Sequence, residues 1–267
     1  MHRTALVTGA SSGIGLATAA ALVARGFRVL GTSRHPDSLE THQRADGVEY
    51  LPLDLTDPAS IEALAATAGP VDVLVNNAGE SQSGPFEELP VEALHRIFEI
   101  NVLGPVRLTQ LILPGMRERG YGRVVMVGSM LASFPLSYRS SYVATKAAIK
   151  GFANGARHEF SPYGVWLTTV EPGSISTGLS ARRTSYIGPD SPHRRDYETM
   201  LAALNRNEAA GVSAERVAAT IVGAIEASRP RQRYAVGSNA SLVFPARRVL
   251  PVWLAEKLTH RRHDLTR

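Results

Sequence analysis

The stretch Thr8-Gly9-Ala10-Ser11-Ser12-Gly13-Ile14-Gly15 decides the fold of this chain. It lies between an apolar run at residues 3–8, which is expected to form a strand, and an alanine-rich segment at residues 13–25, which is expected to form a helix. A glycine-rich turn at such a junction lets the backbone approach a pyrophosphate, and the helix N-terminus offers N–H groups and a positive dipole end to the anion. The sequence therefore predicts a dinucleotide site here, with an ordinary glycine-rich turn as the alternative.

Outward from this turn, short apolar runs alternate with longer helix-like segments, which is typical of a parallel sheet covered by helices. Further strands are expected at 27–32, 48–53, 71–75, 123–128, 165–170 and 231–236, and helices at 58–68, 91–119 (bent near 104–105), 140–160 and 214–227. Residues 178–197 are rich in Arg, Ser, Gly and Pro, as an exposed loop would be.

We therefore expect an α/β protein with a single Rossmann-type domain, a doubly wound parallel sheet of about seven strands flanked by helices on both faces. The catalytic, cofactor-binding domain is expected at residues 1–240, with a substrate lid at about 178–212. Residues 241–267 are expected to be a C-terminal extension that mixes apolar and basic residues. Whether it packs on the domain, caps a binding site or touches a membrane surface stays open.

Composition excludes several classes of protein. The 267 residues are 44% hydrophobic and 20% charged, which is ordinary for a globular protein, and the net charge of +5 is dispersed, so no nucleic-acid partner is expected. The chain has no cysteine and its histidines lack metal-ligand spacing, so no metal is expected. No signal-peptide pattern and no run of about 18 apolar residues is found, so we expect a cytoplasmic protein without an integral membrane span.

Tyr142 and Lys146 are four residues apart in the helix expected at 140–160, so they share one face of it. A cation beside a phenol favours the phenolate, which suits a tyrosine for general acid–base chemistry. Ser129 follows the strand expected at 123–128 and would bring a second hydroxyl to the same place. Alone, this spacing also occurs on solvated helix faces, so the other motifs have to decide.

The end of the second strand, Thr32-Ser33-Arg34, indicates which dinucleotide binds. An acidic residue there would accept hydrogen bonds from the ribose hydroxyls and repel a 2′-phosphate, whereas the planar guanidinium of Arg34 matches a phosphate. Asp37 and Glu40 lie past the expected contact point. We therefore expect NADP(H) in preference to NAD(H).

Together these residues resemble the short-chain dehydrogenase/reductase family, in its single-domain branch, over roughly residues 3–177. The turn at 8–15 matches the family's TGxxxGxG, and Asn76-Asn77-Ala78-Gly79 matches its NNAG. Tyr142 with Lys146 matches its YxxxK, and Pro172-Gly173 matches its PG motif. Asp54 falls at the family's adenine-contacting acid, Asn101 at its helix asparagine and Ser129 at its active serine. The segment from Gly104 to Gly173 is also similar to the branch near the 17β-hydroxysteroid and retinol dehydrogenases.

The resemblance implies an oxidoreductase that interconverts a ketone or aldehyde and an alcohol by hydride transfer. Tyr142 would exchange a proton with the substrate oxygen, Ser129 would hydrogen-bond that oxygen, and Lys146 would bind the nicotinamide ribose. Asn101 would hold a water in a proton relay. Cofactor contacts are implied for Gly9, Ser11, Ser12, Gly13, Ile14, Gly15, Arg34, Asp54, Leu55, Asn77, Ala78, Gly79, Tyr142, Lys146, Pro172, Gly173, Ile175 and Thr177.

The sequence indicates the substrate less directly than the reaction or the cofactor. Met130, Leu131, Phe134, Leu136 and Tyr138 offer an apolar wall, and the resemblance favours a lipophilic steroid-, retinoid- or polyketide-like carbonyl compound. The alternatives are a 3-oxoacyl thioester reductase and, ranked lower, a non-catalytic NADP(H)-sensing regulator or an NADP-dependent epimerase or dehydratase of the longer branch. The resemblance also implies a homodimer or homotetramer formed through the helices at 91–119 and 140–160.

Overall fold

The computed structural model describes residues 3–176, 178 and 182–265. Its centre is a parallel sheet with the strand order β11-β7-β6-β4-β1-β2-β3. The strands are β1 (Thr4–Val7), β2 (Arg28–Ser33), β3 (Val48–Pro52), β4 (Val73–Asn76), β6 (Gly122–Val127), β7 (Val165–Pro172) and β11 (Arg233–Val236). Each coincides with a strand expected from the sequence, so the prediction of a doubly wound parallel α/β fold is confirmed.

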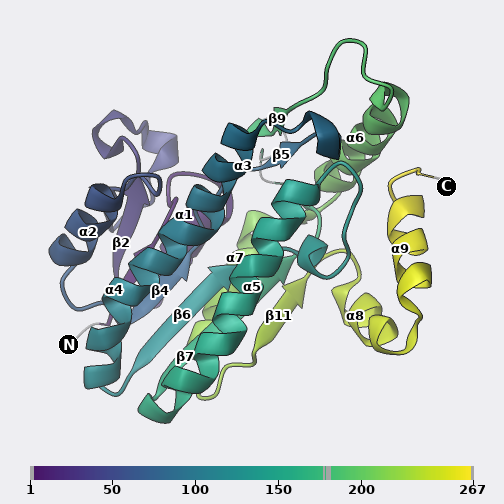
Figure 1. Cartoon of the computed structure of the whole chain (residues 1–267). Coiled ribbons are helices and arrows are strands. Elements are labelled where there is room, and N and C mark those ends of the chain that lie inside the picture. The colour runs from purple at the N-terminus through teal and green to yellow at the C-terminus, as the bar shows by residue number, and fades with distance from the viewer. Residues whose placement is uncertain (1–2, 177, 179–181, 266–267) are drawn as a thin grey trace.

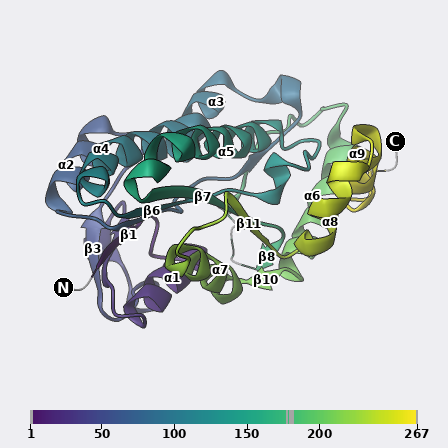
Figure 2. The same ribbon diagram turned by 90° about the horizontal axis from the view of Figure 1, so that it is seen from below.

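Helices cover both faces of this sheet. Successive side chains of a strand point to opposite faces, so each strand contributes to two cores. Leu6 and Leu74 pack with Leu108 in one core, whereas Val7 packs with Val217 in the other. Figure 2 shows α2 (Pro58–Thr67), α4 (Gly104–Glu118) and α5 (Ser140–Phe160) on the first face, with α1 (Gly13–Val23) and α7 (Ala214–Glu226) on the second.

The long helix expected at 91–119 is interrupted by a π-helical turn, Glu99–Leu103. It joins α3 (Val91–Phe98) to α4, just before the glycine and proline that suggested a bend. A residue at this turn therefore sits where the regular helical hydrogen bonding changes, which is a frequent feature of functional sites.

Helix α6 (Arg194–Ala209) lies where the sequence suggested only an irregular lid. Its apolar residues Tyr197, Met200 and Leu204 recur at helical spacing and are buried with Leu136. This short stripe was hidden among arginines and other polar residues. The expectation of a loop through the whole of 178–212 is therefore corrected at α6.

The C-terminal extension forms two helices, α8 (Ala240–Val249) and α9 (Val252–Arg261). Figures 1 and 2 show both at the same end of the molecule as α6. Short parallel pairs, β5 (Gln82–Ser83) with β9 (Thr184–Ser185) and β8 (Ile175–Ser176) with β10 (Val212–Ser213), connect this end to the sheet domain. Within the described ranges, no helix is long and apolar enough to cross a bilayer.

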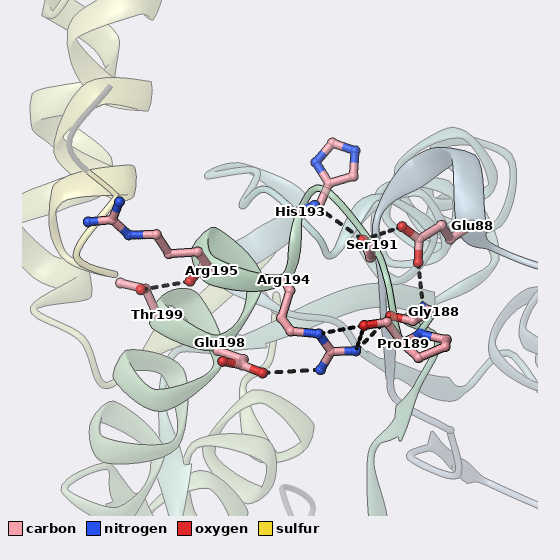
Figure 3. A network of polar contacts seen from close by, with 9 residues as sticks. All are labelled: Glu88, Gly188, Pro189, Ser191, His193, Arg194, Arg195, Glu198 and Thr199. Carbon is pink, nitrogen blue, oxygen red and sulfur yellow. Dashed lines mark hydrogen bonds and ion pairs between the residues drawn. The ribbon is translucent and has the colours of Figure 1, made fainter.

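Polar contacts fix the loop that leads into α6 (Figure 3). The Glu88 carboxylate accepts a hydrogen bond from the Gly188 N–H at 2.7 Å and another from the Ser191 hydroxyl. These bonds, from Ser191 first and then Gly188, lower the pKa of Glu88. The Arg194 guanidinium donates to the carbonyls of Gly188 and Pro189 at 2.7 and 2.9 Å. The segment before α6 is therefore held to the turn that contains Glu88.

Candidate active site

A cavity of about 630 Å³ opens beyond the carboxyl ends of the parallel strands. Its wall contains residues that follow β1, β2, β3, β4, β6 and β7, together with residues of the C-terminal extension. Ligands of open α/β sheets bind at this edge, and the volume is in the range of small-molecule sites.

The glycine-rich turn forms one end of the cavity. Gly9 and Gly13 have φ of +64° and +51°, a left-handed conformation that favours glycine. A Cβ on Gly15 would lie 2.1 Å from the Gly9 carbonyl oxygen, so only glycine allows α1 to approach the turn this closely. Gly9, Ser11, Ser12, Gly13 and Ile14 line the cavity, while Gly15 packs behind them. With no acidic residue in its first turn, the α1 N-terminus can receive a pyrophosphate.

The segment after β4 holds this turn in shape. The backbone N–H groups of Asn77 and Ala78 donate to the Thr8 hydroxyl at 2.9 and 3.0 Å. The Asn77 side-chain amide donates to the Thr8 and Gly9 carbonyl oxygens at 2.9 and 3.2 Å. Asn77, Ala78 and Gly79 also line the cavity.

Arg34 and Asp54 lie at the end of the cavity that β2 and β3 form. Arg34 is exposed and lines the cavity, whereas the Thr32 hydroxyl is occupied by the Gly9 N–H at 3.2 Å. The Asp54 carboxylate accepts from the Thr56 backbone N–H at 2.9 Å and from the Thr56 hydroxyl at 2.8 Å. These hydrogen bonds, aided by the charge of Arg34, lower the pKa of Asp54. Leu55 lines the cavity beside Asp54.

Ser129, Tyr142 and Lys146 come together at the buried part of the cavity. Ser129 follows β6, and the other two project from the first turns of α5. The Lys146 ammonium donates to the Val127 carbonyl at 3.0 Å and lies 5.7 Å from the centroid of the Tyr142 ring. The Ser129 hydroxyl accepts from the Leu131 N–H at 3.2 Å. One wall thus presents two hydroxyl groups and a cation to the same space.

Asn101 lies in the π-helical turn, behind the cavity wall. Its amide nitrogen donates to the Glu80 carbonyl at 3.0 Å and to the Thr145 hydroxyl at 3.2 Å, and its oxygen accepts from the Glu80 N–H at 2.8 Å. A Cβ on Gly79 would come within 2.9 Å of the Asn101 oxygen and 3.8 Å of the Lys146 nitrogen. Asn101 therefore fixes the chain after Gly79 close to Lys146.

Pro172, Gly173 and Ile175 line the cavity where the chain leaves β7. A Cβ on Gly173 would be 2.4 Å from the Ser238 hydroxyl oxygen, so this position requires glycine. Thr177, the last expected cofactor contact, lies outside the described residues.

The cavity also contains residues that the sequence interpretation missed. Arg139 is buried, and its guanidinium carbon lies 4.4 Å from the centroid of the Tyr142 ring. Its place three residues before Tyr142 was an available signal, because residues three apart on a helix are neighbours. Arg182 donates to the Ser12 hydroxyl at 3.3 Å. Arg96, Leu204 and Glu208 also line the cavity and were not expected there. The extension, for which a cap over a binding site was one of the open alternatives, contributes Val243, Ala246, Arg247, Leu250, Ala255, Leu258, Thr259, Arg262 and His263.

Known proteins are similar to this chain in sequence and architecture. A family model described as short chain dehydrogenase matches residues 3–187. Human retinol dehydrogenase 8 is 30% identical over 86% of this chain and 80% of its own. The crystal structure of a short-chain dehydrogenase from Streptomyces avermitilis is 36% identical over 98% of this chain and 96% of its own, with a TM-score of 0.83. A short-chain dehydrogenase from Sphingobium yanoikuyae in complex with NADPH is 25% identical over 92% of both chains, with a TM-score of 0.73.

Proposed function

The chain belongs to the short-chain dehydrogenase family, and we propose that it transfers hydride between NADP(H) and a lipophilic carbonyl compound or alcohol, with Tyr142 as proton donor or acceptor. Membership makes it an oxidoreductase that interconverts CH–OH and C=O groups with a nicotinamide cofactor. The observation that carries the proposal is the shared wall of Ser129, Tyr142 and Lys146 in one cavity with the glycine-rich turn.

The residues present fit a phosphorylated dinucleotide. The Gly9–Gly15 turn is packed so closely that a Cβ on Gly15 would clash with it, and the N–H groups at the start of α1 would bind the pyrophosphate. Arg34 would bind the 2′-phosphate that distinguishes NADP(H) from NAD(H), because its guanidinium is exposed at the cavity wall. The NADPH of the Sphingobium relative is consistent with this choice.

When bound, the nicotinamide would supply or accept the hydride. During reduction Tyr142 would donate its hydroxyl proton to the carbonyl oxygen, and Ser129 would hold that oxygen by a hydrogen bond. Lys146 would stabilise the tyrosinate that remains, since an ammonium favours a nearby anion. Asn101 would keep the segment after Gly79 in place through its bonds to the Glu80 backbone.

An apolar part of the cavity supports a lipophilic substrate. Met130, Leu131 and Phe134 line it from the sheet domain, while Leu250 and Leu258 line it from the extension. We therefore propose that α8 and α9 cap the substrate site. The name of the human relative, a retinol dehydrogenase, is consistent with a substrate of this kind.

The test is a panel of steroid, retinoid and aryl ketones plus one 3-oxoacyl thioester, assayed by NADPH absorbance with wild type and Tyr142→Phe. We expect turnover of lipophilic ketones and a loss of roughly 10²–10⁴-fold in kcat/KM in the variant, the contribution of a positioned general acid. NADPH fluorescence titration should give similar affinities for both proteins, which shows that the variant is folded.

Three outcomes would contradict parts of the proposal. Unchanged turnover by Tyr142→Phe would overturn the mechanism. Turnover of the thioester alone would replace the lipophilic substrate with an acyl thioester. NADPH binding without turnover of any carbonyl would favour a sensing regulator over an enzyme.

A further inference from the structure

Arg139 is a buried cation with unused hydrogen-bond donors. It is 3% exposed and lines the cavity, and one terminal nitrogen donates to the Ser81 hydroxyl at 3.0 Å. Within the described part of the chain, its Nε and its second terminal nitrogen are buried without a hydrogen-bond partner. Burial lowers the pKa of Arg139 to about 10, so it stays protonated at neutral pH. A buried charge of this kind is costly unless an anion meets it.

The neighbouring groups do not supply that anion. Glu208 of α6 is the carboxylate whose charge acts on Arg139, but both of its oxygens accept from one terminal nitrogen of Arg183, at 2.6 and 2.7 Å. The Arg183 side chain is itself only 2% exposed, and its Nε is also buried without a partner among the described residues. Two buried arginines thus share one glutamate, which leaves a net positive charge at the cavity.

The positive charge of Arg139 lies next to the proposed proton donor, Tyr142. Its guanidinium carbon lies 4.4 Å from the centroid of the Tyr142 ring, so a group bound to it would lie beside the proposed proton donor. A planar guanidinium with free N–H donors matches a carboxylate, and such charge-assisted bonds are the strong ones. The part of the wall near the extension carries the apolar side chains of Phe134, Leu250 and Leu258, together with the cations of Arg247 and Arg262.

We propose that Arg139 binds a carboxylate of the substrate, so that the enzyme acts on an oxo acid or hydroxy acid with an apolar remainder. This inference rests on the proposed function and adds to it an anionic group close to the reacting carbon. The apolar remainder packs toward the extension, and the carboxylate accepts hydrogen bonds from the Arg139 nitrogens that lack a partner.

The test compares free acids with their neutral esters. Benzoylformate and benzoylpropanoate, each beside its methyl ester, are titrated calorimetrically into NADP⁺-saturated wild type, Arg139→Gln and Arg139→Lys. We expect wild type to bind at least one acid roughly ten- to a hundredfold tighter than its ester, the equivalent of one charge-assisted hydrogen-bonded contact. Arg139→Gln should lose this preference, and Arg139→Lys should keep part of it because the charge remains.

Arg206→Gln is the matched control, because Arg206 is exposed, pairs with Asp264 and lies outside the cavity wall. It should bind acid and ester as wild type does. NADPH fluorescence shows whether each variant is folded, and the acid–ester comparison on wild type needs no variant.

Equal affinity of wild type for acids and esters would overturn the inference, as would an acid preference that survives in Arg139→Gln. Kinetics separate this failure from failure of the proposed function. If the enzyme reduces neutral ketones and shows no preference for acids, the carboxylate site is refuted and the proposed reductase activity stands. If acids bind better than esters only when Arg139 is present, but no carbonyl compound causes NADPH oxidation, the anion site stands and the proposed reductase activity is refuted.

Discussion

At Gly15 the packing is so close that one methyl group should oppose cofactor binding. A Cβ there would lie 2.1 Å from the Gly9 carbonyl oxygen and 2.5 Å from the Asn77 amide nitrogen. Both atoms belong to the hydrogen-bonded turn, so neither can move without deforming it. We expect Gly15→Ala to weaken NADPH binding at least about tenfold and to lower the melting temperature. Fluorescence titration and thermal unfolding measure the two effects.

Gly223 provides the control for this substitution. It is an exposed residue inside α7, and a Cβ there would meet no atom within 4 Å. Gly223→Ala should raise the unfolding free energy by about 0.4–1 kcal/mol, because alanine loses less backbone entropy on folding. Its NADPH affinity should equal that of wild type. An equal affinity in Gly15→Ala would show that the turn is not the pyrophosphate site.

Arg34 should decide between the two nicotinamide dinucleotides. Replacing it with leucine removes the guanidinium but leaves the turn and the strand unchanged. We expect Arg34→Leu to reduce kcat/KM with NADPH roughly ten- to a hundredfold, the loss of one hydrogen-bonded charge pair. The value with NADH should change little, since NADH has no 2′-phosphate. A wild type with a higher kcat/KM for NADH than for NADPH would refute the expected preference.

The residue scale also shows what the sequence could and could not predict. The predicted site residues after β1, β2, β3, β4, β6 and β7 could be placed in one cavity because parallel strands end at the same edge of a sheet. The unpaired state of Arg139 could not be predicted in this way. It depends on where Ser81, Arg183 and Glu208 lie in the folded chain, and each is more than forty positions from Arg139 in the sequence.

At the scale of elements, His263 should make the C-terminal helices sensitive to pH. Burial lowers the pKa of this residue, which lines the cavity just after α9 and donates a hydrogen bond from Nδ1 to the Thr259 carbonyl at 2.8 Å. Its neighbours Arg262 and His260 oppose protonation, whereas Asp264 favours it. The ordinary pKa of histidine is about 6.5. Above that pH His263 is neutral in both the folded and the unfolded state, and its full contribution to the stability of the folded state is present.

Below that pH the unfolded segment takes up a proton that the packed segment resists, so stability falls until the lowered pKa is reached. We expect hydrogen exchange in α9 to increase relative to α1 when the pH is lowered from 7 to about 5. His263→Gln should flatten this difference because glutamine does not titrate. The same relative increase in His263→Gln would assign the effect to other groups.

Helix α6 shows why this end of the molecule was harder to predict from the sequence than the sheet domain. The strands and the helices that cover them have long apolar patterns, and these were placed correctly. In α6 the apolar stripe is a few side chains set among arginines, and its burial depends on Leu136 and the loop fixed by Glu88. Such a helix is stabilised by tertiary packing more than by its own sequence, so local composition favoured a loop.

At the scale of the whole molecule, α5 offers a surface for self-association. Phe152 on this helix is 49% exposed, and α4 runs beside α5 on the same face of the sheet (Figure 1). We propose the dimer or tetramer that the family resemblance implies, with this face in the interface. Light scattering should show wild type as a dimer or tetramer and Phe152→Arg as a smaller species, because a buried arginine without a partner is unfavourable.

Trp253 on α9 is a suitable control, since it is 63% exposed and belongs to the extension. Trp253→Arg should leave the mass of the assembly unchanged. A monomeric wild type would end the proposal, and dissociation by Trp253→Arg alone would move the interface to the extension.

The bond between Asn77 and Thr8 joins residues 69 positions apart. A chain that leaves the ribosome N-terminus first therefore exposes every glycine of the nucleotide turn long before the amide that shapes it has been synthesised. The turn can close only when β4 has been added beside β1, so a nascent chain that ends before β4 has no formed nucleotide site. Because a ligand stabilises only the state that binds it, the cofactor can assist folding only after β4 and Asn77 have been synthesised. The cofactor concentration in the cell would thus affect how many chains complete folding. It would not affect the first stage of folding, before β4 has been synthesised.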